Sequence, residues 1–177
     1  MHFAIRKEIE ANLPFQPGGS APSSTIAICS QPDAEAIADG ETERFEWMDL
    51  RDVAGAMDRL IDAAEIVLEV AEATLVLVYP FETAVVRELR AENGTAFTRG
   101  ELMKRIDETY RKVYALDEES QSSQTHDETA DREAMLNRPL SEGEFGIWGH
   151  EYRDLGVGSI DVHEVSNRVW LDPVMES

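Results

Sequence analysis

A chain of 177 residues has room for one globular domain with a flexible extension. Acidic residues outnumber basic ones by 36 to 16, which gives a formal net charge of −20 and a surface that repels phosphate backbones and anionic lipid headgroups. We therefore expect no direct nucleic-acid or membrane binding, and a protein partner, in particular a basic one, suits the charge better.

Cys29 is the single cysteine, which excludes an intrachain disulfide and a cysteine-based zinc site. The first residues contain no apolar stretch long enough for a signal peptide. No segment approaches the roughly 20 apolar residues that cross a bilayer. These features predict an intracellular, cytoplasmic protein, in a host cytoplasm or a virion if the source is viral.

Residues 1–45 are rich in proline, glycine and serine, and we expect a flexible arm that crosses the surface. Two short apolar pieces in it, Phe3 to Ile9 and Thr25 to Cys29, have the character of a helix turn and a strand that dock on the domain. Residues 46–177 are then expected to form a single α+β domain.

Apolar residues at helical spacing predict a helix from Asp49, its N-cap, to about residue 70. The segment Glu65 to Val70 also alternates in the manner of a strand. Both interpretations of residues 65–70 stay open at this point.

Two β-rich segments follow, Thr74 to Tyr79 and Ala84 to Ala91. Asn93-Gly94 is a strong turn signal, because both residues tolerate a positive φ. The turn is expected to reverse the chain into a short strand, Thr95 to Phe97.

Thr98 and Glu101 have the spacing of a capping box at the start of a helix predicted over residues 99–118. Leu102, Ile106 and Tyr110 begin a single apolar stripe along it. Residues 118–133 are polar and acidic, and we expect a mobile loop there.

The chain is predicted to end in a hairpin, with strands Ser159 to Val165 and Arg168 to Val174 around Ser166-Asn167. Together the elements predict an α+β fold in which a small, mostly antiparallel sheet carries two main helices.

The segments Phe97-Thr98-Arg99-Gly100-Glu101-Leu102, Asn137-Arg138 and Gly146-Ile147-Trp148-Gly149-His150 together resemble a pattern in uncharacterised proteins of large DNA viruses and algae. The resemblance covers roughly residues 74–174. It implies a hairpin that leads into a helix, and a C-terminal hairpin after the Gly-Ile-Trp-Gly-His segment. It implies no activity and no functional residue.

Two histidine–glutamate pairs, His150-Glu151 and His163-Glu164, are the candidates for chemistry. Asp161 shares a strand face with His163, because side chains alternate along a strand. His150, His163, Asp161 and Glu151 are therefore the candidate catalytic residues. The sequence contains no His-Glu-x-x-His motif, so we predict neither a metal site nor a cofactor, and exposed strand residues are the simpler interpretation.

The glycine-flanked segment from Phe145 to His150 is the candidate binding segment, with Trp148, His150 and Tyr152 as its binding residues. One interpretation is a loop that contacts a partner or lines a pocket. The favoured interpretation is a buried aromatic plug, in which Trp148 belongs to the core.

The expected function is that of a non-enzymatic interaction or structural protein, a component of a viral or host assembly. The alternative is a small metal-dependent hydrolase that uses the histidine and carboxylate candidates. The two differ in geometry, because an enzyme needs those groups to converge in one concave pocket.

Overall fold

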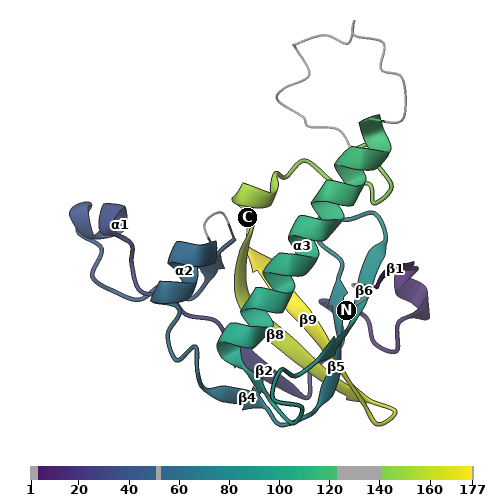
Figure 1. The fold of residues 1–177 in the computed structure, drawn as a ribbon, viewed down its shortest axis with the longest axis horizontal. Coiled ribbons are helices and arrows are strands. Elements are labelled where there is room, and N and C mark those ends of the chain that lie inside the picture. Colours follow the sequence, from purple (N-terminus) through teal and green to yellow (C-terminus); the bar gives the residue numbers. More distant parts are fainter. Residues whose placement is uncertain (1–3, 51–52, 123–140, 177) are drawn as a thin grey trace, which may run out of the picture.

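The computed structural model describes residues 4–50, 53–122 and 141–176. Within them the protein is a mixed α/β fold with a seven-stranded sheet, a small two-stranded sheet and few helices (Figure 1). The strands are β1 (Ile5–Glu8), β2 (Ser24–Ala27), β3 (Met48–Asp49), β4 (Ile66–Leu68), β5 (Glu72–Leu77), β6 (Ala84–Arg90), β7 (Phe97–Thr98), β8 (Gly156–Val165) and β9 (Arg168–Glu176). The helices are α1 (Ala34–Ala38), α2 (Val53–Arg59) and α3 (Arg99–Ser122), with short 3₁₀ turns η1 (Glu10–Asn12) and η3 (Tyr152–Asp154).

The large sheet has the strand order β1-β6-β5-β9-β8-β2, and β3 also pairs with β8. Its neighbours run antiparallel, except that β5 and β9 are parallel, with Thr74 opposite Trp170. The sheet is larger than the one we predicted. The reason is that the N-terminal part of the chain adds β1 and β2 at the two edges and β3 beside β2 along β8.

The two faces of the large sheet are buried by different parts of the chain, because successive side chains of a strand point to opposite faces. Helix α3 lies across one face (Figure 1). There Leu75, Leu77 and Val85 share a core with Leu102, Ile106 and Tyr110 of the helix. On the other face, Phe15 from the N-terminal segment joins a smaller core with Val76, Ala84, Val86 and Trp170.

The helix predicted over residues 49–70 is wrong over most of its length. Helix α2 covers only Val53–Arg59, and Asp49 lies in β3, opposite Gly156, instead of capping a helix. Asp62 has a left-handed backbone with φ of 54°, which the α-helix cannot contain. Beyond it β4 pairs with β7, so the alternation over residues 65–70 was the signal to follow.

Helix α3 confirms the helix predicted at residue 99 and continues four residues past the expected end, to Ser122. The hydroxyl of Thr98 accepts a hydrogen bond of 3.1 Å from the Glu101 amide, as an N-cap does. The Glu101 carboxylate accepts instead from the Glu92 amide at 2.7 Å, so it ties the preceding loop to the helix.

Strands β5 and β6 and the hairpin of β8 and β9 confirm the strands predicted there. Ser166 and Asn167 both have positive φ, of 53° and 58°, as a tight two-residue hairpin turn requires. The short strand predicted over Thr95 to Phe97 overlaps β7 only at Phe97, and the partner of β7 is β4 rather than the strand before the turn.

The described part of the predicted arm, residues 4–45, includes strands β1 and β2 and the segment that carries Phe15. The expected strand at Thr25 to Cys29 overlaps β2, whereas the helix turn expected at Phe3 to Ile9 is wrong, because strand β1 lies there and pairs with β6. The flexibility of this arm stays a prediction. Of the predicted loop 118–133, residues 118–122 belong to α3 and the others lie outside the described residues, as does Asn137-Arg138.

Candidate functional site

Asp161 and His163 lie two residues apart on β8 and share a face of the sheet, opposite Asp172 and Trp170 of β9. This is the face that the N-terminal segment covers. The Phe15 ring stacks on the imidazole of His163, with ring centroids 4.1 Å apart and planes inclined by 14°. His163 is buried rather than exposed, and burial lowers the pKa of its imidazole, opposed by the charge of Asp161.

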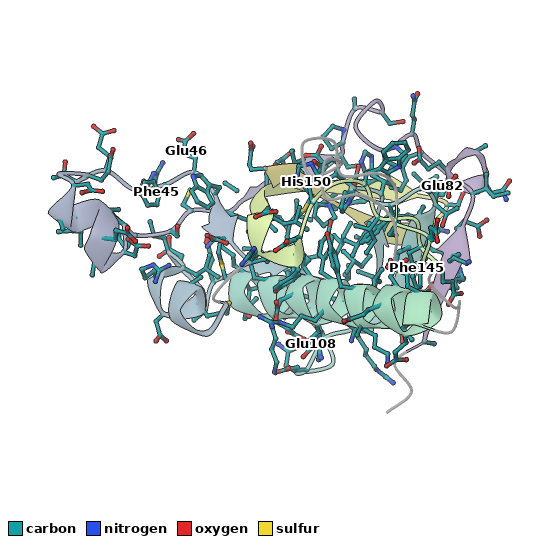
Figure 2. The ribbon with its side chains drawn as sticks, turned by 90° about the horizontal axis from the view of Figure 1, so that it is seen from above. Phe45, Glu46, Glu82, Glu108, Phe145 and His150 are labelled. Atoms are coloured by element: carbon teal, nitrogen blue, oxygen red, sulfur yellow. The ribbon has the colours of Figure 1, made fainter. Side chains whose placement is uncertain are left out.

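His150 lies on the other side of the sheet, with α3. Its ring packs against Tyr79, with centroids 5.4 Å apart, and its carbonyl accepts a hydrogen bond of 3.0 Å from the Tyr114 hydroxyl of the helix. In Figure 2 the labelled His150 lies on the strand side of the view, away from the ribbon of α3, and the Tyr114 side chain spans this distance to reach the His150 carbonyl. The sheet therefore separates His150 from His163.

Glu151 also has a structural role. Its carboxylate forms an ion pair of 2.6 Å with Arg153, and its amide donates to Asp154 in the cap of η3. The four residues proposed for catalysis are thus not brought together. No group of three or more histidine, cysteine or acidic side chains that could hold a metal occurs within residues 4–50, 53–122 and 141–176.

The segment that carries Trp148 is held by backbone hydrogen bonds. The Trp148 amide donates to the carbonyl of Pro80 at 2.8 Å, and the Glu82 amide donates to that of Gly146 at 2.9 Å. Ser141 closes the segment, because its amide donates to the Ile147 carbonyl and its hydroxyl accepts from the Ile147 amide at 2.6 Å.

Trp148 is 54% exposed, which overturns the prediction that it belongs to the core. Phe145 and Ile147 are the buried hydrophobic residues of the segment, and Ile147 forms a β-bridge with Phe81. Neighbouring side chains in extended backbone point in opposite directions, so a buried Ile147 turns Trp148 outward. The sequence placed both residues in the plug, although an extended segment buries only one of them.

Aromatic side chains from three parts of the chain surround this segment, and we call them with Trp148 the aromatic surface: Tyr79, Tyr114, Trp148, His150 and Tyr152. Apart from Trp148, all are half-buried. Tyr114 and Tyr152 meet edge to face, with centroids 5.9 Å apart, next to the contact of His150 with Tyr79. Large rings with polar tips are common at protein-binding surfaces.

An ion pair orders the α3 side of the aromatic surface. Asp107 accepts a hydrogen bond from the Tyr152 hydroxyl and pairs with Arg111 at 2.9 Å. The Arg111 guanidinium lies 4.7 Å from the centre of the Tyr152 ring. Desolvation raises the pKa of Asp107, opposed by the hydrogen bond from Arg111. The hydrogen bond at its hydroxyl and the guanidinium against its ring hold Tyr152 in one orientation.

The charged side chains around Trp148 are mainly acidic. Residues 141–151 contain three glutamates and no lysine or arginine. Glu82, which hydrogen-bonds to this segment through its amide, and Glu142 are exposed. Glu144 forms an exposed ion pair of 3.4 Å with Lys7. The exposed Glu82 and Glu142 therefore give the surroundings of Trp148 a negative charge.

Sequence reasoning identified Trp148, His150 and Tyr152 and missed Tyr79 and Tyr114. Tyr114 lies four residues beyond Tyr110 on α3, next to the apolar stripe rather than in it. Such a flanking aromatic residue is a usable signal. For Tyr79, two residues past the end of β5, only the fold shows that it meets His150.

No family model, curated protein or solved structure matches this chain. None of the helices in the described part of the chain is long and apolar enough to cross a membrane.

Proposed function

We propose that the protein is a non-enzymatic interaction protein that binds a basic protein partner through the aromatic surface, as a component of a larger assembly. The observation that carries the proposal is the 54% exposure of Trp148 on a segment whose backbone is tied to residues 80–82 and 141.

A rigid, exposed tryptophan suits binding for two reasons. Tryptophan, tyrosine and arginine dominate the residues whose loss weakens protein complexes most. A side chain presented by an ordered backbone also loses less conformational entropy on binding than one on a mobile loop. Trp148 has both properties, and Tyr152, another residue of the aromatic surface, has the Arg111 guanidinium against its ring.

The chemistry of the partner follows from charge. The chain carries a net charge of −20, and the exposed Glu82 and Glu142 lie on the segments that are hydrogen-bonded around Trp148. Arginine or lysine side chains of a partner would meet these carboxylates while an apolar part covers the indole. A viral or host assembly is one setting for such a partner.

The alternative, a metal-dependent hydrolase, receives no support from the geometry. It needs His150 and His163 in one pocket, whereas these residues pack on different sides of the sheet, one against Tyr79 and the other against Phe15.

The test is a titration followed by the indole N–H resonances of the three tryptophans, each assigned from a tryptophan-to-phenylalanine variant. The probe is a ten-residue peptide in which arginine alternates with alanine, and its comparison has glutamate in place of arginine. We expect a saturable shift of the Trp148 resonance with the arginine peptide alone. Trp148→Ala should weaken binding roughly tenfold, the effect of losing a binding hot spot.

Ile66→Ala is the matched control, because Ile66 is also 54% exposed and lies on β4. It should leave the affinity unchanged. If Trp148→Ala and Ile66→Ala bind the arginine peptide equally well, the aromatic surface is not the docking site.

A further inference from the structure

A pocket of about 650 Å³ opens where β3 meets the ends of β8 and β9. Besides Leu155 it is lined by Trp47, Asp49, Arg153, Asp154, Gly156 and Glu176. Its volume falls in the range typical of sites for small ligands. Tyr152 of the aromatic surface belongs to η3, as do Arg153 and Asp154, but Tyr152 does not line the pocket.

Trp47 forms a fixed wall of this pocket. Its carbonyl accepts a hydrogen bond of 2.8 Å from the hydroxyl of the buried Ser30, and its ring stacks on Phe45, with centroids 5.6 Å apart. Gly156 lets the indole lie close to β8, because a Cβ at that position would come within 3.0 Å of the indole Cε3. The indole nevertheless remains 37% exposed.

The rest of the lining is predominantly acidic. Three carboxylates, those of Asp49, Asp154 and Glu176, face one cation, Arg153. Arg153 is already paired with Glu151 at 2.6 Å, so its charge is largely compensated outside the lining. Asp154 accepts from the Glu151 amide at 3.1 Å, which holds one carboxylate in position.

We propose that this pocket binds an organic cation, a guanidinium or alkylammonium group whose apolar stem packs on the Trp47 indole while the carboxylates neutralise its charge. Aromatic faces attract such cations, most strongly when the ring is an indole. A planar guanidinium can stack on the ring and donate to a carboxylate at the same time. The inference does not depend on the proposed function, since it concerns a different tryptophan and different carboxylates.

The first experiment titrates the protein with agmatine, which carries both a guanidinium and an alkylammonium group, and follows the Trp47 indole N–H resonance. We expect a saturable shift of this resonance and none of the buried Trp170. N-butylacetamide, an uncharged probe with an apolar stem, should produce no saturable shift. The titration extends to tens of millimolar agmatine, a few times the weakest dissociation constant of interest. The absence of a saturable Trp47 shift over this range would overturn the proposal.

A second probe, the blocked tripeptide Gly-Arg-Gly, distinguishes two sources of the same chemistry. Tighter binding of the tripeptide assigns the pocket to an arginine side chain of a peptide, and tighter binding of agmatine assigns it to a free amine. Either result supports a cation site. Failure of both probes to bind contradicts it.

Glu176→Gln removes one charge from the lining and should weaken agmatine binding about fivefold, the effect of one exposed carboxylate near a cation. Glu164→Gln is the matched control, an exposed carboxylate on β8 outside the lining. Equal affinities of these two variants would contradict the proposal. Trp47→Phe should also weaken agmatine binding, because it removes the indole. The proposed function rests on Trp148 instead, so a failure of the cation-site proposal leaves it intact.

Discussion

The aromatic ring of Phe15 lies flat on the imidazole of His163, with centroids 4.1 Å apart. This contact joins the N-terminal segment to the C-terminal hairpin across almost the whole length of the chain. Phe15 also meets Trp170 edge to face, at 6.2 Å. The segment around Phe15 is therefore a structural cover of one sheet face.

Phe15→Ala should lower the free energy of unfolding by about 3 kcal/mol, because it removes a large side chain that is only 8% exposed. Urea denaturation measures the loss. Ile9→Ala, at a residue that is 64% exposed in the same segment, should change it by less than about 0.5 kcal/mol. If the segment were a freely flexible arm, both variants would have the midpoint of the wild type.

Asp172 should make stability depend on pH. Burial raises the pKa of its carboxyl to about 6, opposed by a hydrogen bond of 3.2 Å from the Gly18 amide. The ordinary value is about 3.9, so its contribution to stability is complete below about pH 4 and is lost as the pH rises through 6.

Asp172→Asn should therefore be more stable than the wild type at pH 8, by on the order of 1–3 kcal/mol, and nearly equal to it at pH 4. Urea denaturation at both pH values tests this. His163 contributes a pH dependence of the opposite sign, because burial lowers the pKa of its imidazole. His163 and the charge of Asp161 are present in both proteins, so their effects largely cancel in the stability difference between the variant and the wild type. A difference that is the same at both pH values would show that Asp172 is not the titrating group.

Thr98→Ala should lower the free energy of unfolding by about 1 kcal/mol, because it removes the hydroxyl that accepts from the Glu101 amide at the start of α3. Thr42→Ala, at an exposed loop threonine, is the control. The urea midpoint should fall for Thr98→Ala alone, with an unchanged m-value. An unchanged midpoint means that the hydroxyl does not stabilise the helix.

Asp117 connects α3 to the segment that carries Trp148. Its buried carboxylate accepts from the Phe145 amide at 2.8 Å and from the Gln121 side chain at 2.8 Å. Asp117→Ala should cost about 1–3 kcal/mol, because it leaves a buried donor unpaired. Hydrogen exchange at the Phe145 amide should accelerate, whereas Glu118→Ala, at the exposed neighbour, should leave it slow. Retained protection of that amide in Asp117→Ala would exclude this role.

Local patterns predicted the elements whose stabilising contacts are near in sequence. Thr98 caps its own helix three residues away, and Ser166-Asn167 turns adjacent strands. The patterns failed where a distant partner decided the conformation. Residues 66–68 fit both the helical spacing and a strand alternation, and pairing with β7, about 30 residues later, makes them a strand.

The candidate site shows the same division. Three of its residues, Trp148, His150 and Tyr152, were identified from the sequence. The burial of Trp148 was predicted wrongly, because the sequence does not reveal that Ile147 pairs with Phe81. The separation of His150 from His163 was also not predictable. It depends on which sheet face each residue joins, and that is decided by α3 on one side and Phe15 on the other.

The sequence by itself determined the charge of the chain, the start of α3, strands β5 and β6 and the C-terminal hairpin, because composition and short-range spacing contain that information. The tertiary structure alone decided the position of β9 beside β5, the exposure of Trp148 and the pocket against Trp47. Each of these depends on contacts between segments far apart in the chain. Such contacts form when apolar faces are buried together, and local propensity does not specify which faces meet.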